Sequence, residues 1–381
     1  MLMNALQKFA RERQSGIVAL TRQFVECESP SEDRIAVNRM VNLVADVVSG
    51  FGKVSIFNGG KYGKHLRCEF TLPGCKKDGS ILLLGHSDTV WPVGTLHSMP
   101  FTQTGGRLWG PGVLDMKSGV AFAIFAIRAL VELDRPVSRR VFLQLNSDEE
   151  VGSPSSRPLT EEIGRKSSAV LVLEFGHGTA GKLKTSRKGV AVYNVEVKGF
   201  NSHAGLDPEK GANAILELSK QITHVSGIGN PARGTTVNVG LISGGTRPNV
   251  VPSEARMEVD VRFASMREVV AVQRKFKALA PFDKRCKLQI TGGVRRPPMR
   301  QSTASRELFR KACSLADEIG VPLDESATGG TSDGNFTAAL GVPTLDGLGG
   351  VGEGAHASNE SILENRIPDR VALLAGLIAS L

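Results

Sequence analysis

Acidic and imidazole side chains follow three short apolar segments of this chain, each with the length and composition of a buried strand. The segments are residues 81–84, 141–145 and 169–173, and the groups that follow them are His86 and Asp88, Glu149 and Glu150, and Glu174. Ligands of an open α/β sheet bind beyond the carboxyl ends of the strands, so we expect these side chains to face one crevice. Carboxylates gathered there would repel one another unless a cation neutralised them. The pattern therefore predicts a metal site.

A further carboxylate, Asp115, stands between the turn Gly110-Pro111-Gly112 and a long apolar stretch. Imidazole and carboxylate ligands without thiolates suit Zn, Mn, Co or Ni, and zinc is the most common choice in hydrolytic enzymes. The candidate ligands outnumber the three protein groups that usually hold a single catalytic zinc. Two ions that share a bridging carboxylate would use all of them.

The elements that must position these groups predict an α/β fold class, a central mixed sheet flanked by helices. Helical periodicity covers residues 2–27 and 34–49, and the apolar stretch 116–133 is expected to be a buried helix. Strands are expected near 54–57 and 66–72, besides the three segments above. Strands and helices mixed in this way up to about residue 185 are typical of α/β domains.

Between residues 189 and 292 the order of predicted elements becomes β-α-β-β-α-β, the ferredoxin-like motif. The strands are expected at 189–199, 236–242, 255–263 and 286–291, and the helices at 211–225 and 267–280. The remaining chain predicts a helix at 303–319, a glycine-rich loop at 328–334, a strand near 342–345 and a helix at 368–380. These last pieces are too few to fold alone. We therefore expect one domain of residues 1–188 and 293–381, with residues 189–292 inserted as a second, α+β domain.

The composition is that of an ordinary globular protein: 381 residues, 41% hydrophobic and 22% charged. A net charge of +9 would suit an acidic ligand or nucleic acid. However, like charges form no block, and two Trp and two Tyr are few for base stacking. The five cysteines form no CxxC pair, which predicts reduced thiols, and the amphipathic N-terminus resembles neither a signal peptide nor an anchor. We expect a cytoplasmic protein that binds neither nucleic acid nor a membrane.

Seven motifs occur in the order and approximate spacing of one family: GHSDTVW, GPGVLDMKSG, SDEEVGS, VLEFG, SHAG, RPNVVP and GAHASNE. The chain resembles the co-catalytic di-zinc peptidases and amidohydrolases that include glutamate carboxypeptidase of the carboxypeptidase G type, acetylornithine deacetylase, succinyl-diaminopimelate desuccinylase and aminoacylase. It is most similar to the glutamate carboxypeptidase type. The resemblance covers nearly the whole chain and implies that the inserted domain is a dimerisation and lid domain.

The resemblance implies two Zn²⁺ ions per subunit, with Co²⁺ or Mn²⁺ as possible substitutes. The implied ligands are His86 and Glu174 for one ion, Glu150 and His356 for the other, and Asp115 as the bridge between them. Asp88 would accept a hydrogen bond from the His86 ring and fix its tautomer. Glu149 would be the general base that takes a proton from the bridging water and passes it to the leaving nitrogen.

Other implied residues would contact the substrate. His203 of SHAG would stabilise the oxyanion from the partner subunit of a homodimer, although by itself it could be a surface loop histidine. The implied substrate contacts are Asn249, Arg262, Arg296 and Gly330. Arginine suits a substrate carboxylate because its planar guanidinium pairs with both oxygens. Arg262 could instead pair with Asp260 or Glu258 on its own sheet.

These inferences favour metal-dependent hydrolysis of an amide bond next to a free carboxylate in a small N-acyl amino acid or peptide. The product would be a C-terminal amino acid, with glutamate as the best single guess. One alternative is an N-acyl amino acid deacylase of the acetylornithine deacetylase, succinyl-diaminopimelate desuccinylase or aminoacylase type, because loops rather than ligands set specificity. Another is a non-catalytic binding or scaffold protein, but such members usually lack a ligand or the base, and here every position holds a competent residue.

Overall fold

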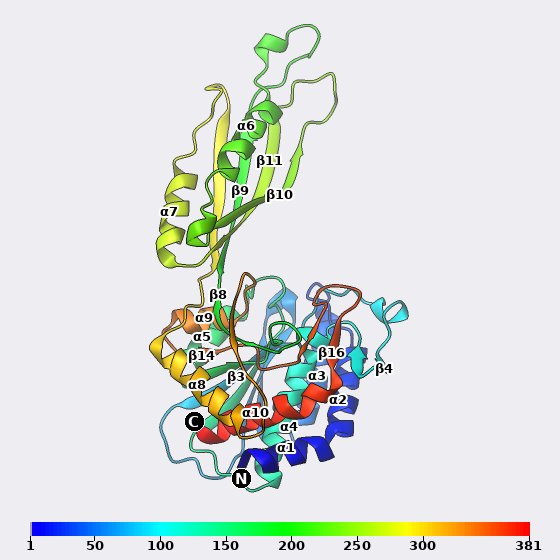
Figure 1. Cartoon of the computed structure of the whole chain (residues 1–381). Helices are drawn as coiled ribbons and strands as arrows, with labels where there is room; N and C mark the ends of the chain where they lie inside the picture. Colours follow the sequence, from blue (N-terminus) through cyan, green and yellow to red (C-terminus); the bar gives the residue numbers. More distant parts are fainter. Residues whose placement is uncertain (1) are drawn as a thin grey trace. The chain divides into compact units, whose positions relative to one another are not determined.

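The structure is a computed structural model that describes residues 2–381. The chain divides into two compact units, whose helices and strands are labelled in Figure 1. The first unit comprises the chain up to Ser186 with Gln301–Thr328 and Ser332–Leu381, and the second comprises Arg187–Arg300 with Gly329–Thr331. The second unit thus begins at 187 and ends at 300, rather than at 189 and 292, and it also includes Gly330.

A six-stranded mixed sheet forms the centre of the first unit, in the order β1-β2-β6-β3-β7-β14. Its strands are β1 (Gly52–Asn58), β2 (Lys64–Phe70), β3 (Ser80–His86), β6 (Arg140–Asn146), β7 (Ser167–Val172) and β14 (Thr344–Leu345). Strand β3 is parallel to β6 and β7, and β14 is parallel to β7, whereas β2 is antiparallel to β1 and β6. The predicted central mixed sheet is confirmed.

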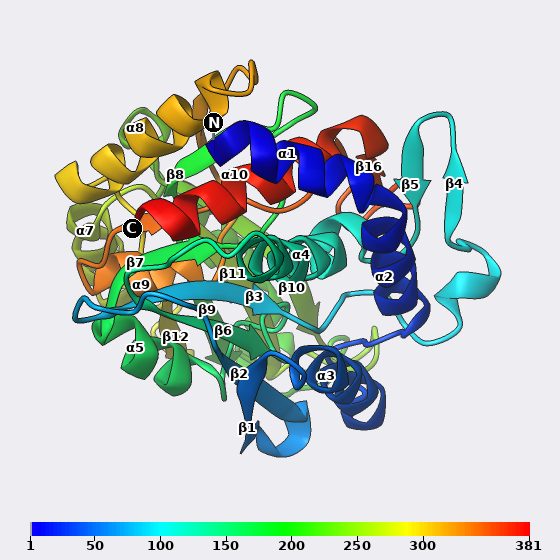
Figure 2. The same ribbon diagram turned by 90° about the horizontal axis from the view of Figure 1, so that it is seen from below.

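Alternate residues of β3 point into two separate apolar cores. Ile81 and Leu83 belong to the larger core, and Leu82 and Leu84 to the smaller one. Helices α1 (Leu2–Glu12), α4 (Ser118–Glu132) and α10 (Ile367–Ser380) stack together over the larger core (Figure 2). On the other face α5 (Arg157–Arg165) contacts β7 and α9 (Gly334–Ala339). Strands covered on both faces are apolar throughout, which is why β3 reads as one continuous apolar run.

The remaining helices of this unit are α2 (Gln14–Glu26), α3 (Arg34–Val48) and α8 (Thr303–Asp317). The helix predicted at 2–27 is two helices, which are separated at Arg13. The helix predicted from 116 begins at Ser118, because residues 113–117 form a wide turn with non-helical dihedrals at Asp115 and Met116. Among the described residues, none of the helices combines the length and the apolar character needed to span a bilayer.

Short elements of the first unit were not predicted. A small sheet has the order β15-β16-β5-β4, and β13 pairs with β8. These strands are β4 (Thr102–Thr104), β5 (Arg107–Trp109), β8 (Leu183–Arg187), β13 (Glu325–Thr328), β15 (Gly352–Glu353) and β16 (Ser361–Leu363). Helix α5 was also missed, because it buries a single large apolar side chain, that of Ile163. Elements this short or this polar carry little periodicity.

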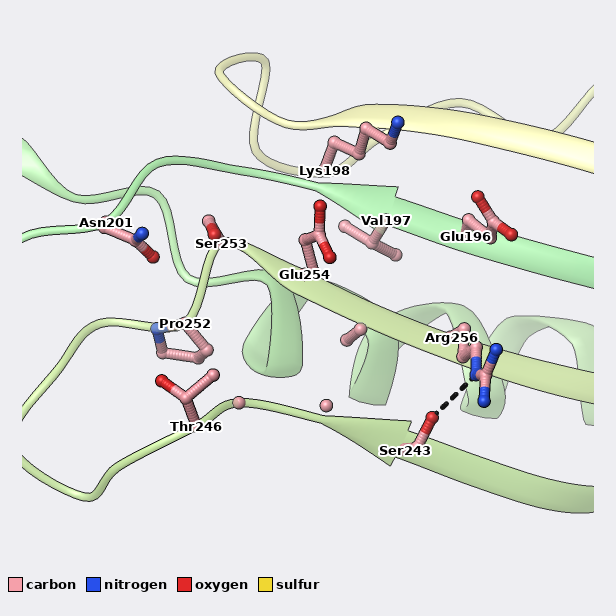
Figure 3. Close-up of a pocket in the computed structure, with 13 residues that line it drawn as sticks. Glu196, Val197, Lys198, Asn201, Ser243, Thr246, Pro252, Ser253, Glu254 and Arg256 are labelled. Atoms are coloured by element: carbon pink, nitrogen blue, oxygen red, sulfur yellow. Dashed lines mark hydrogen bonds between the residues drawn. The ribbon is translucent and has the colours of Figure 1, made fainter.

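The second unit has the ferredoxin-like order predicted for it. Its elements are β9 (Gly189–Lys198), α6 (Ala214–Ser226), β10 (Thr236–Gly244), β11 (Glu254–Phe263), α7 (Met266–Lys277) and β12 (Lys287–Arg296). The sheet is antiparallel throughout, in the order β10-β11-β9-β12, and α6 and α7 cover one face (Figure 1). The open face holds a polar hollow of about 530 Å³, lined by Glu196, Lys198, Glu254 and Arg256 among others (Figure 3).

Candidate metal centre

The parallel register of the central strands brings the predicted ligands to one edge of the sheet. Strand β3 pairs Leu84 with Val172 of β7, so Glu174 lies at the level of His86, two residues further along. His86 itself pairs with the last residue of β6, after which the loop that carries Glu150 begins. His86, Asp115 and Glu150 offer ligand atoms within 4.8 Å of one another. The convergence of distant acids therefore follows from strand pairing.

Asp115 lies between the two histidines. Its Oδ1 is 3.1 Å from His86 Nε2, and its Oδ2 is 3.4 Å from His356 Nε2. His86 Nε2 is also 3.7 Å from Glu174 Oε1, and His356 Nε2 is 3.2 Å from Glu150 Oε1. The two oxygens of one carboxylate thus face two imidazoles, each of which has a further carboxylate beside it. This is the arrangement that a carboxylate shared by two cations requires.

The electrostatics of this cluster call for added positive charge. Burial alone would lower the pKa of His86, but hydrogen bonds to Asp115 and Asp88 outweigh it and hold that pKa well above its usual range. Hydrogen bonds to Asp115 and Glu150 raise the pKa of His356 to about 10, and burial raises the pKa of Glu150 to about 7. The carboxylates therefore favour the protonated, positively charged form of the histidines beside them. Divalent cations bound at this place would supply the same positive charge. Imidazole nitrogens with carboxylate oxygens fit zinc and related ions.

Asp88 connects two loops of the centre. Its fully buried carboxylate accepts the backbone N–H groups of Glu149 and Glu150, both at 3.1 Å, and the Ser31 hydroxyl at 2.7 Å. His86 Nδ1 lies 2.9 Å from the Asp88 carbonyl oxygen but 3.5 Å from the Asp88 carboxylate. The nearest acceptor for the ring is therefore the carbonyl, and the Asp88 carboxylate, the partner that we expected, is the more distant of the two and raises the pKa of His86. A carbonyl only accepts, so Nδ1 carries the proton and Nε2 is left to bind a cation.

Two of the predicted substrate residues lie together in the second unit. The backbone N–H of Ala204 donates to the Asn249 carbonyl at 3.0 Å, which joins the loop of His203 to the loop of Asn249. His203 Nδ1 accepts the backbone N–H groups of Gly205 and Leu206, at 3.1 and 3.2 Å. In the neutral ring the proton is then on Nε2, so the exposed His203 is a hydrogen-bond donor at that atom.

The two predicted arginines lie at the opposite end of the same sheet. Arg262 and Arg296 both pair with Val190, one from β11 and one from β12. Arg262 forms an ion pair with Asp260 at 2.8 Å, the alternative that the sequence left open. The Gly330 carbonyl accepts a hydrogen bond from Arg187 Nη1 at 3.3 Å, within the same unit. The second unit therefore places Arg262 and Arg296 at one end of its sheet and His203 with Asn249 at the other.

Two buried acids that support the centre were not assigned from the sequence. Asp148 accepts the backbone N–H groups of Ser155 and Ser156, at 2.7 and 3.2 Å, and so closes the loop that follows Glu150. Glu360 accepts four N–H groups from segments near the metal ligands. Both acids stand inside motifs quoted above, SDEEVGS and GAHASNE, and that was the signal that could have identified them.

Comparison with known proteins agrees with this geometry. The model of peptidase family M20/M25/M40 matches residues 82–380. Carboxypeptidase G2 of Pseudomonas sp. (strain RS-16) is 31% identical over 308 residues, which are 79% of this chain and 74% of that protein. A succinyl-diaminopimelate desuccinylase of Dechloromonas aromatica (strain RCB) is 28% identical over 320 residues, 78% of this chain and 82% of that protein. The aminopeptidase PepT of Bacillus cereus ATCC 10987 shares the fold, with a TM-score of 0.76 at 23% identity over 96% of this chain and 98% of that one.

The family match spans most of the chain and includes the positions of all the candidate metal ligands. The fold shared with a solved peptidase has the same two parts, a mixed central sheet and a separate antiparallel sheet. The chain therefore belongs to peptidase family M20/M25/M40, and it is a carboxypeptidase-like metal-dependent peptidase or amidohydrolase.

Proposed function

We propose that this protein is a di-zinc carboxypeptidase that hydrolyses an amide bond next to a free carboxylate and releases a C-terminal glutamate. The observation that carries the proposal is the Asp115 carboxylate, whose two oxygens face His86 and His356. Glu174 would complete the site of one ion and Glu150 the site of the other. Zinc ions bound there would polarise the scissile carbonyl and acidify water.

Glu149 is the proposed general base. Its backbone N–H is held by Asp88, and its carboxylate offers an oxygen within 4.8 Å of the ligand atoms of His86 and Glu174. A carboxylate at this place can take a proton from the attacking water and deliver it to the leaving nitrogen. Asp88 would contribute to catalysis by positioning Glu149, because its carboxylate accepts the backbone N–H groups of both Glu149 and Glu150.

The oxyanion donor that we propose is His203 of the partner copy in a homodimer. Strand β9 has ten residues, so about 30 Å separate the end of the sheet near Arg262 from the end near His203. One small substrate cannot reach both ends of a single copy. If the arginines and His203 serve the same substrate, two copies must contribute to each site. The Nε2–H group of His203 is the donor that the oxyanion needs.

Edge strand β10 and helix α6 form the surface that we propose for the second copy. Leu241 and Ile242 of β10 are 65% and 66% exposed, and Leu216 of α6 is exposed beside Ile215. An exposed apolar edge strand is a template for pairing with another chain. We expect Ile242→Lys to convert a dimer to a monomer in sedimentation velocity. The control Val270→Lys, at a site on α7 that is 53% exposed, should leave the dimer intact; dissociation by both variants would count against this surface.

Glutamate is the proposed product because two kinds of observation support an acidic substrate. Carboxypeptidase G2 is 31% identical to this chain, and Arg262 and Arg296 lie on either side of Val190 on one sheet. Guanidinium groups recognise carboxylates through paired hydrogen bonds. The second candidate is an N-acyl amino acid deacylase, which the 28% identity to a succinyl-diaminopimelate desuccinylase supports.

The compartment that we propose is the cytoplasm. All five cysteines, which lie within the described chain, are free thiols in the structure. Proteins in reducing compartments keep their cysteines in this state. Secretion with disulfide formation would contradict this proposal, and mass spectrometry of the native protein would detect it.

Amino-acid release from one matched panel tests the substrate. The panel contains N-acyl-glutamates including a folate, N-acetylornithine, N-succinyl-diaminopimelate, other N-acetyl amino acids and simple dipeptides. We expect the zinc-loaded protein to release glutamate selectively and a chelator to abolish the release. Selective cleavage of another member would keep the proposed chemistry and replace glutamate as the product. No cleavage of any member by protein that holds two zinc ions would reject the proposal.

Two variants test the residue roles. Glu149→Gln should keep both ions and lose turnover by about 10²–10⁴-fold, whereas Glu132→Gln, on the surface of the same unit, should keep it. Normal turnover by metal-loaded Glu149→Gln would remove Glu149 as the base. Mixed dimers of Glu149→Gln and His203→Ala chains should regain activity, because one of their two sites is complete. Verified heterodimers without activity would count against the cross-subunit donor.

A further inference from the structure

Glu360 is a fully buried carboxylate with four N–H donors. Oε2 accepts the indole N–H of Trp91 at 2.8 Å and the backbone N–H of Gly112 at 2.9 Å. Oε1 accepts the backbone N–H groups of Leu114 at 2.9 Å and Asp115 at 3.0 Å. The side chain has no solvent exposure, so each of these bonds replaces a bond to water.

Three of the donors come from one short segment that is folded around the carboxylate. Gly112 has φ +72°, and a Cβ there would lie 2.7 Å from Thr89 Cγ2, so glycine suits both its conformation and the space. Backbone N–H groups that converge in this way form an anion-binding concavity. Here the anion is part of the protein, and the segment that it holds ends at Asp115.

The same carboxylate also connects the Asp115 segment to the other loops of the centre. Glu360 is four residues from His356, and its carbonyl accepts the backbone N–H of Gly110 at 3.3 Å. Trp91 follows Asp88 after the exit of β3. Glu360 is thus bonded to the segment that ends at Asp115 and, through Trp91, to the loop that follows His86. Glu360 itself belongs to the loop that carries His356.

We infer that Glu360 is a positioning residue: it sets the separation of Asp115 from His356 and thereby controls the affinity of the ion that His356 and Glu150 would hold. This inference rests on the metal centre of the proposed function. The ion at His86 and Glu174 should depend on Glu360 less, because it is linked to that carboxylate only through the shared Asp115 and through Trp91, which lies five residues after His86.

The substitution Glu360→Gln tests the inference with almost no change in size. Each carboxylate oxygen accepts two N–H groups, and the amide nitrogen of Gln accepts none, so two donors lose their partner. Groups that orient metal ligands typically change metal affinity by about 10–100-fold when they are removed. We expect a loss of that size for one of the two ions and a smaller loss for the other.

The matched control is Glu217→Gln. Glu217 is a buried glutamate of the second unit that accepts the backbone N–H groups of Phe282 and Asp283, at 3.0 and 2.9 Å. The substitution Glu217→Gln should lower the melting temperature of the metal-free protein without changing the affinity for either metal ion. Equal weakening of metal binding by both variants would overturn the inference, because general destabilisation would then explain it.

The readouts are stepwise Zn²⁺ affinities, from competition with a chelator, and the visible absorption spectrum of the Co²⁺-loaded protein. Glu360→Gln should weaken one step and change the spectrum of the second Co²⁺ bound. If Glu360→Gln binds both Zn²⁺ ions with wild-type affinity and its Co²⁺ spectrum is unchanged, the inference is overturned, even if the melting temperature is lower.

If Glu360→Gln does not fold, Trp91→Phe removes one donor and keeps the carboxylate. It should weaken the same step to a smaller extent, and no change would overturn the inference. Wild-type protein that binds fewer than two ions would instead reject the proposed metal centre.

Discussion

Replacing Gly119 with alanine should destabilise the first unit, although alanine favours helices. Gly119 is the second residue of α4, and a Cβ there would lie 2.1 Å from the carbonyl oxygen of Leu173 and 3.4 Å from Gly349 Cα. Carbon and carbonyl oxygen normally approach to about 3.3 Å, so the helix or the strand end must move by about 1.2 Å. The atom in the way is backbone and immediately precedes Glu174, so the displacement would reach a candidate metal ligand.

The magnitude follows from two opposing contributions. Overpacking typically costs about 1–3 kcal/mol, and a clash with backbone belongs at the upper end of that range. Alanine in place of glycine inside a helix stabilises by about 1 kcal/mol. The expected net loss for Gly119→Ala is therefore about 2 kcal/mol. A unit of this size loses about 2–4 °C in melting temperature for each kcal/mol, which gives a decrease of about 4–8 °C.

Thermal unfolding of the metal-free protein, followed by circular dichroism, measures this effect without the stabilisation that bound ions would add. The control is Gly50→Ala, since a Cβ at Gly50 meets no atom within 4 Å. Gly50→Ala should leave the melting temperature unchanged or slightly higher. Gly119→Ala should also lower the affinity for the ion at Glu174 by about 10–100-fold, as measured by competition with a chelator. A Gly119→Ala protein as stable as wild type would refute the reasoning, because helix propensity would then outweigh the close contact.

Buried groups elsewhere in the first unit lead to three more expected outcomes. Arg370→Met should destabilise the metal-free protein in urea unfolding, because the guanidinium donates to three backbone carbonyls and each stranded carbonyl costs about 1–3 kcal/mol; a loss below the cost of one carbonyl would contradict this. Burial lowers the pKa of His65, so the folded chain keeps the ring neutral while the unfolded chain protonates it near pH 6.5. Stability should therefore fall as the pH drops through that value, and the melting temperature of His65→Gln should depend less on pH between about 7 and 5; an equal slope would contradict this assignment. Burial raises the pKa of Cys68 to about 12, so a thiol reagent at about pH 8 should modify the exposed Cys75 first, as peptide mass spectrometry would show.

Most of the architecture could be predicted from local patterns. The continuous apolar run of β3 and the alternation in the second unit each reflect a repeat of side-chain burial over a few residues. The same patterns failed where burial is slight, as in α5, and where backbone conformation decides, as at 113–117. A wide turn at the start of an apolar helix leaves no mark on the hydrophobic pattern.

The residue types of the candidate centre could also be read from the sequence, because each acid or histidine stands beside a strand or turn that the pattern identifies. How these residues meet is a property of the tertiary structure alone. His356 and Glu150 lie 206 residues apart, and Glu360 accepts donors from residues 245 to 269 positions away. The four bonds to Glu360 likewise depend on how separate loops pack over the sheet. Local sequence determines which groups are available, whereas strand register and loop packing determine their distances, because contacts between distant segments form only when the whole sheet is assembled.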